Sequence, residues 1–282
     1  MKLIITADDF GRSTHINAAV IQAHRQGILT AASLMVAGDA FDEAVELARQ
    51  TPTLAVGLHV VLVDGKPVLP PERLRGLVDE NGRFPDSPAR LGMQYFFNPR
   101  ARRQVAEEIA AQFERFAQTG LPLAHVDGHQ HLHLHPAVFP MVARLAGQYG
   151  AGGIRLPRDE LRLALHYNSA QALTKLSWSI VFGLLSRWSL RALRELNLPV
   201  ARRVYGLMQT GQMEERYVIE LLRHIQADSA EIYFHPTTGP RTDALGPNPD
   251  ELATLLIPSV RQAVADGGFR LSSYRDLPKG RQ

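Results

Sequence analysis

Carboxylate and imidazole side chains gather in four clusters along the chain. Each cluster stands at or near the end of an apolar run; they are Asp8 with Asp9, His59, the five-histidine segment HVDGHQHLHLHP at 125–136, and His235. Imidazoles and carboxylates bind divalent metals and also transfer protons. The chain has no cysteine, so a thiolate nucleophile and a cysteine-type zinc site are excluded.

The neighbouring acids Asp8 and Asp9 need a cation if both are to stay charged. An isolated buried pair would raise the pKa of one carboxyl until it became neutral. With a divalent metal bound by Asp9 and two imidazoles, Asp8 can remain an ionised base beside the metal. One carboxylate and two histidines also leave a coordination position open for water, as in catalytic zinc sites. The alternative is that the acid pair caps a loop or a helix.

The histidine-rich segment leaves several choices of ligand open. On an extended chain His129, His131 and His133 share one face, whereas on a helical turn His129 and His133 do. Asp127 is a candidate partner for a ligating imidazole. The alternatives are an adventitious metal binder or a solvated loop, and His59 by itself fits a core histidine with its hydrogen bonds satisfied.

Apolar runs alternate with helical patterns, which predicts an α/β fold with parallel strands. The expected strands are 2–7, 31–37, 54–62, 124–128, 153–156, 231–234 and 269–271, and the main expected helices are 13–26, 41–50, 102–118 and 249–265. Active sites of such folds gather at the carboxyl ends of the strands, so the four clusters should converge. Asn81-Gly82 predicts a hairpin over 77–84. We expect one domain over residues 1–282, because α/β barrels of this size have a single core.

Composition narrows the classes of function. With 45% hydrophobic and 21% charged residues the chain should fold around a substantial core. A formal charge of +3 does not indicate nucleic-acid binding. The first ten residues have no hydrophobic region or cleavage site of a secretion signal, so we expect a cytoplasmic protein.

Residues 160–213 interrupt the alternation and predict a helical insertion with no clear strand. Its uncharged centre, 176–186, is well short of the roughly 20 residues that cross a bilayer. Trp178, Phe182 and Trp188 suggest an apolar cap or interfacial helix that receives a lipid-linked sugar and contacts the inner membrane surface peripherally. The basic residues that would lie near anionic headgroups are Lys175, Arg187, Arg191 and Arg194. The alternative is packing against the barrel or a subunit interface in a homo-oligomer.

The order of the clusters resembles the YdjC-type carbohydrate deacetylases. The matching motifs are ADDFG at 7–11, GLH at 57–59, HVDGHQHLH at 125–133 and FHP at 234–236, and the resemblance runs from residue 2 to about 277. It implies a distorted (β/α) TIM-like barrel of the polysaccharide-deacetylase type. It also implies one divalent ion, zinc or magnesium, bound by Asp9, His59 and His129, with Asp8 as general base and His235 as general acid.

The resemblance implies hydrolysis of an N-acetyl group from an amino sugar. Arg155 either orients a carboxylate such as Asp8, binds substrate or forms a structural salt bridge, and His133 is a further candidate for supporting the site or binding substrate. Length, insertion and the GIRLPRDE stretch at 153–160 resemble the hopanoid-biosynthesis deacetylases, which implies an N-acetylglucosaminyl lipid as substrate. The alternatives are cytosolic chitobiose-like oligosaccharides, or a non-catalytic metal- or sugar-binding module.

Overall fold

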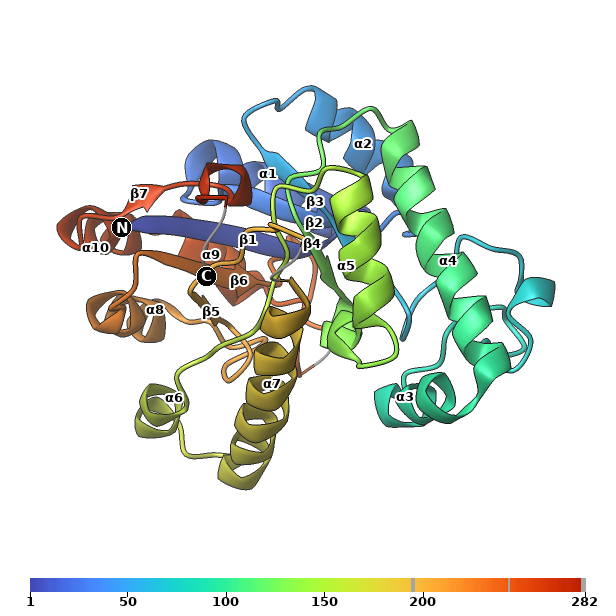
Figure 1. The fold of residues 1–282 in the computed structure, drawn as a ribbon. Coiled ribbons are helices and arrows are strands. Elements are labelled where there is room, and N and C mark those ends of the chain that lie inside the picture. The colour runs from blue at the N-terminus through green and yellow to red at the C-terminus, as the bar shows by residue number, and fades with distance from the viewer. Residues whose placement is uncertain (194–195, 243, 280–282) are drawn as a thin grey trace.

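The computed structural model describes residues 1–193, 196–242 and 244–279. Its centre is a curled, seven-stranded parallel sheet with helices packed around it (Figure 1). The strands are β1 (Lys2–Phe10), β2 (Ala31–Leu34), β3 (Ala55–Val60), β4 (Val126–Gly128), β5 (Arg203–Tyr205), β6 (Ser229–Phe234) and β7 (Arg270–Leu271). They lie in the order β4-β3-β2-β1-β6-β5, and β7 pairs with the first residues of β1.

An irregular segment, residues 154–158, lies between β4 and β5, the two outermost strands in this order. Ile154 bridges to Val126 of β4 in parallel, and Arg158 bridges to Val204 of β5 in antiparallel orientation. The strand predicted at 153–156 therefore exists only as isolated bridges between β4 and β5. This placement brings the fully buried side chain of Arg155 into the barrel.

Ten α-helices and three short 3₁₀ helices are assigned in the described residues. The α-helices are α1 (Thr14–Gln26), α2 (Phe41–Arg49), α3 (Pro88–Phe97), α4 (Pro99–Gln118), α5 (Phe139–Gln148), α6 (Leu161–Tyr167), α7 (Ala172–Leu193), α8 (Glu215–His224), α9 (Pro249–Leu256) and α10 (Pro258–Asp266). The 3₁₀ helices are η1 (Pro71–Arg73), η2 (His129–Leu134) and η3 (Tyr274–Asp276). Ser13 caps α1, the first of the expected helices, accepting a hydrogen bond from the backbone N–H of Ile16.

The predicted α/β fold with a curled parallel sheet is confirmed, with three local corrections. The expected helix 249–265 is split into α9 and α10 because Pro258 has no N–H to continue the first helix. The expected hairpin at 77–84 is only a turn, in which the Asp79 carboxylate accepts hydrogen bonds from the N–H groups of Asn81 and Arg83. A local turn signal does not guarantee that the flanking residues pair.

The third correction concerns the insertion. Residues 160–213 contain α6 and α7 as expected, but also β5, which pairs in parallel with β6. The prediction of no strand is wrong here because three residues are too few to show a periodicity, and their pairing partner lies 27 residues further along the chain. No helix within the described ranges combines the length and apolar character needed to cross a membrane.

Candidate metal and catalytic site

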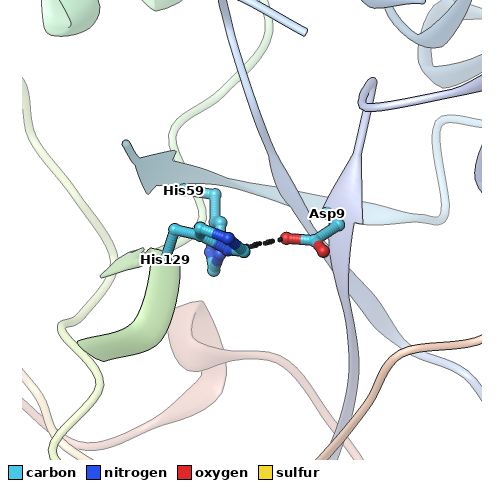
Figure 2. Close-up of side chains that lie close together, drawn as sticks. All are labelled: Asp9, His59 and His129. Atoms are coloured by element: carbon cyan, nitrogen blue, oxygen red, sulfur yellow. Dashed lines mark ion pairs between the residues drawn. The ribbon is translucent and has the colours of Figure 1, made fainter. Parts of the chain in front are cut away.

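Asp9, His59 and His129 meet at the carboxyl ends of three strands. Asp9 lies near the end of β1, His59 near the end of β3, and His129 directly after β4. Figure 2 shows the carboxylate of Asp9 extending from β1 toward the two imidazole rings on the opposite side. Oδ1 of Asp9 is 3.1 Å from Nδ1 of His129 and 3.4 Å from Nε2 of His59. The structure therefore brings together three side chains that the sequence separates by up to 120 residues.

These three residues fit a divalent metal ion. Oδ1 of Asp9 is buried and has no hydrogen-bond partner, although two imidazoles face it. One possible ligand atom from each of the three side chains lies within 4.8 Å of the others. A divalent ion held by these residues would satisfy the carboxylate oxygen that the fold leaves without a hydrogen-bond partner.

A second group, Asp8, His59 and Asp127, is equally compact but is already paired. Oδ1 of Asp127 lies 2.8 Å from Nδ1 of His59, and its Oδ2 lies 2.8 Å from Nη1 of Arg155. A carboxylate on Nδ1 selects the tautomer in which Nδ1–H donates and the Nε2 lone pair is free. Asp127 is thus placed to orient His59 toward the first group, so we favour Asp9, His59 and His129 as the ligand set.

In the metal-free chain, Asp9 and His129 each favour the charged form of the other. Burial opposes the ionisation of Asp9, but His129, Arg12 and His59 together hold its pKa well below its usual value. Burial also opposes protonation of His129, but Asp9 and Asp64 outweigh it and raise its pKa to about 9. This raised pKa stabilises the metal-free fold fully below pH 6.5, and the contribution is lost as the pH rises through about 9.

Binding of Zn²⁺ is expected to release about one proton at about pH 7.5, because His129 is protonated in the metal-free chain and must become neutral to bind. Calorimetric titrations in Pipes and Hepes, which differ in ionisation enthalpy and bind Zn²⁺ only weakly, measure the number released. Zn²⁺ affinity should therefore rise as the pH approaches 9. Binding without proton release would contradict the protonated state of His129.

Asp8 lies beside the ligand group, between Arg155 and His235. Nη1 of Arg155 donates to Oδ2 of Asp8 at 2.6 Å, and Nη2 donates to Oδ1 at 2.8 Å. Nε2 of His235 is 3.9 Å from Oδ2 of the same carboxylate. The backbone N–H of His235 donates to the buried carboxylate of Glu251, which ties the histidine to α9. The predicted base and the predicted acid are therefore neighbours.

The buried guanidinium of Arg155 contacts three carboxylates. Besides Asp8, Arg155 contacts Oδ2 of Asp127 and Oε1 of Glu231, each at 2.8 Å, and its guanidinium lies 4.6 Å from the ring centroid of Tyr233. Of the roles expected for Arg155, the geometry matches orientation of Asp8 within a buried ion-pair network. A guanidinium with no exposed surface and three carboxylate partners is not available for a further anionic ligand.

The other histidines of the 125–136 segment point elsewhere. Gln130 and His131 have positive φ angles of 49° and 55°, so the chain is neither extended nor continuously helical there. His131 contacts the hydroxyl of Tyr233 at 2.9 Å, and Nε2 of His133 lies 3.0 Å from the backbone oxygen of Arg155. Neither of the shared faces considered from the sequence is present. His133 supports the Arg155 backbone rather than the ligand group.

His125, at the start of the same segment, has a structural setting. Its ring stacks on Tyr274 with a centroid distance of 5.2 Å, and its Nε2 lies 3.0 Å from the hydroxyl of Ser33. A Cβ at Gly57 would lie 2.4 Å from this ring, so the glycine of the GLH motif makes room for it. Ser33 also donates to Asp127 at 2.7 Å and was not identified from the sequence, since a lone serine in an apolar run gives no signal.

Arg12 and Asp64 also belong to the site and were missed. Nη1 of Arg12 is 3.1 Å from Oδ2 of Asp9, and its Nη2 is 3.0 Å from Oδ2 of Asp64. The same Asp64 oxygen lies 3.5 Å from Nε2 of His129. Asp64 follows the carboxyl end of β3, and this position could have identified it. Arg12 therefore contacts the candidate ligand Asp9, and Asp64 contacts the candidate ligand His129.

Replacing Asp64 with Asn is expected to weaken Zn²⁺ binding about 10–100-fold, the usual effect of removing a group that orients a ligating side chain. The amide keeps the shape but removes the negative charge facing His129 and Arg12. Competition with a chromogenic chelator measures the affinity. Asp266→Asn, at an exposed acid of α10 that accepts a hydrogen bond from Gln262, is the matched control and should bind like the parent chain. Equal affinity for both variants would exclude the role of Asp64.

The three aromatic residues suggested to face lipid occupy different environments. The ring of Phe182 packs against His131 with a centroid distance of 5.5 Å, and Trp178 is partly buried against the core. Trp188 is 38% exposed, and its ring contacts Phe139. Of the three, only Trp188 is among the exposed large apolar side chains of α7, which also include Leu173, Leu176, Ile180, Val181 and Leu184.

The fold and the Asp-His-His group define an α/β barrel with a candidate metal centre at the carboxyl ends of its strands. Residues 2–266 match the family model described as YdjC-like protein. The chain therefore belongs to the YdjC-like family.

Several proteins resemble the whole chain or part of it. A carbohydrate deacetylase of Geobacillus stearothermophilus is 31% identical, and a chitooligosaccharide deacetylase of Serratia marcescens is 30% identical, each match covering 98% of both chains. A carbohydrate deacetylase of Brevibacillus brevis is 43% identical over 149 residues, which span 53% of this chain and 57% of that protein. The fold is shared with a putative cellobiose-phosphate cleavage protein of Enterococcus faecalis, with a TM-score of 0.74, 24% identity and 97% coverage of both chains.

Proposed function

We propose that this protein is a metal-dependent hydrolase that removes the N-acetyl group from an amino sugar. The observation that carries the proposal is the convergence of Asp9, His59 and His129 around a buried carboxylate oxygen that has no hydrogen-bond partner, with Asp8 and His235 alongside. The names of the relatives from Geobacillus and Serratia, which align with nearly the whole chain, support the same reaction class.

The residues of the candidate site have different proposed roles in the reaction. Asp9, His59 and His129 would hold the divalent ion, which supplies polarisation of the acetamide carbonyl and lowers the pKa of water from 15.7 to about 7. Asp8, held by Arg155, accepts a proton from the attacking water. His235 donates a proton to the departing amine as the carbon–nitrogen bond breaks. Acetate and a free amino sugar are the products.

For the substrate we propose an N-acetylglucosaminyl lipid, as for the hopanoid-biosynthesis deacetylase HpnK. Supporting this choice, α7 exposes a row of large apolar side chains, while its Phe182 contacts His131, two residues from the candidate ligand His129. A soluble oligosaccharide needs no such apolar surface. The second candidate is a chitobiose-like oligosaccharide, which the name of the Serratia relative favours.

Acetate release from both substrates tests these proposals. The lipid-linked sugar and N,N′-diacetylchitobiose are offered to the purified protein before and after treatment with a chelator. We expect release from the lipid-linked sugar, its loss after chelation, and its return when Zn²⁺ or Mg²⁺ is added. Equal specific activity on the soluble sugar would contradict the lipid proposal. No release from either substrate with any divalent ion would favour a binding module without turnover.

A further inference from the structure

Two exposed apolar surfaces lie on either side of the segment that carries His129. Both α3 and α7 pack against η2, the 3₁₀ helix that begins with this histidine. In Figure 1 both helices project toward the lower side of the molecule, α7 at the centre and α3 at the right. A surface on these two helices would therefore border the candidate site.

The apolar residues on both helices are large and well exposed. On α3 they are Met93, Phe96 and Phe97, and on α7 they are Leu173, Leu176, Ile180, Val181, Leu184 and Trp188. Phe97 is 76% exposed and Leu184 is 60% exposed, values unusual for such side chains unless another surface covers them. Since α7 is apolar around most of its circumference, packing one side on the barrel leaves the other without cover.

The charges on these helices indicate what covers them. Residues 88–103, which span α3 and the start of α4, contain four arginines and no acidic residue. Residues 172–193 of α7 contain one lysine, two arginines and no acidic residue. The whole chain is nearly balanced, with 31 basic and 28 acidic residues, so this excess is local. Exposed cations beside exposed apolar groups on helices fit the surface of an anionic bilayer.

The basic residues available for headgroups differ in part from those expected from the sequence. Those on the surface are Arg90, Arg100, Arg102, Arg103, Arg187 and Arg191. Lys175, which the sequence suggested, is buried, and its ammonium donates to the backbone oxygen of Asn168. Arg194 lies outside the described residues. Cations are therefore present on both apolar helices, which is the arrangement that a flat, negatively charged surface requires.

We propose that α3, the first turn of α4 and α7 form a docking surface for anionic phospholipid bilayers, with the candidate site between the two apolar helices. The helices lie on the bilayer and do not span it. The inference rests on the proposed function only for its purpose, the delivery of the site to a lipid-linked sugar. Binding to lipid is measured without turnover. Lipid binding can therefore be absent from a protein that deacetylates a soluble sugar, and it can be present in a protein that does not deacetylate.

Co-sedimentation of the full-length protein with vesicles tests the proposal. One set contains phosphatidylcholine alone, and the other contains phosphatidylcholine with phosphatidylglycerol. We expect binding to the second set, weakened as salt is raised. The double variant Arg187→Gln/Arg191→Gln should partition about 25-fold more weakly into the anionic vesicles, because each interfacial cation contributes a factor of about five. Arg223→Gln, at an exposed residue of α8, is the charge control and should bind normally.

The apolar side chains are tested one helix at a time. Phe97→Ser on α3 and Leu184→Ser on α7 should each reduce binding, whereas Leu271→Ser, at an exposed leucine on β7, should not. All three side chains are exposed, so thermal unfolding should match the parent protein. Binding to neither vesicle, or equal binding to both, would overturn the proposal. So would a dimer in light scattering that Leu184→Ser dissociates, because a second copy of the chain would then cover the surface.

Discussion

Asp8→Asn is expected to slow acetate release by about 10²–10⁴-fold, the usual contribution of a positioned base. The amide fills the same space but cannot accept the proton from water. Since Asp8 is outside the favoured ligand set, the affinity for Zn²⁺ should stay within about 10-fold of the parent value. A change of this size is the smallest usually seen when a residue that supports a metal ligand is replaced. The measurements are initial rates of acetate release and Zn²⁺ affinity by chelator competition, on the same preparation.

The same variant distinguishes the two possible ligand groups. Asp8 belongs to the second group with His59 and Asp127, so loss of metal binding in Asp8→Asn would place the ion there. Unchanged turnover would refute the base role itself. Asp266→Asn serves as the control, because it makes the same chemical change at an exposed acid of α10, away from these groups.

Arg155→Met is expected to lower the free energy of unfolding by about 3–5 kcal/mol, the range for breaking a buried ion pair by removing one partner. The thioether fills much of the space but leaves Asp8, Asp127 and Glu231 buried without their shared cation. Nearby carboxylates without a counter-charge repel one another, and each has also lost the water that would solvate it. Urea unfolding followed by circular dichroism measures the change.

Two further variants make the stability measurement interpretable. Arg155→Lys keeps a positive charge but loses the bidentate contact with Asp8, so it should retain part of the stability even if Arg155→Met does not fold. Arg73→Met breaks an exposed pair with Glu107 and should cost no more than about 1 kcal/mol. If Arg155→Met unfolded at the same urea concentration as Arg73→Met, the contacts of Arg155 with the three carboxylates would not contribute to stability as we infer.

The sequence was sufficient for the α/β class and for most of its regular elements. Buried parallel strands are continuous apolar runs, and Ser13 marks the start of α1 by a local capping rule. The sequence did not predict the ordinary helices α3 and α8, and it also failed where the form of a segment depends on distant partners. Three-residue β5 exists because β6 pairs with it, and the strand predicted at 153–156 is reduced to isolated bridges to β4 and β5.

For the site, the sequence determined which chemistry was available and that it would converge. Asp9, His59 and His129 lie at the carboxyl ends of parallel strands, which meet, and no cysteine competes as a ligand. Their roles as ligands, and those of Asp8 and His235, remain predictions for the experiments above.

The tertiary structure alone decided which histidine of the 125–136 segment faces Asp9, and which side chains support that group. Positive φ angles at Gln130 and His131 break every simple periodicity, so neighbours in sequence point in different directions. Arg155 meets Asp8 across 147 residues and Arg12 meets Asp64 across 52. Such contacts form only when the closed barrel brings distant residues within a few ångströms of each other. They leave no pattern in the local sequence from which they could be predicted.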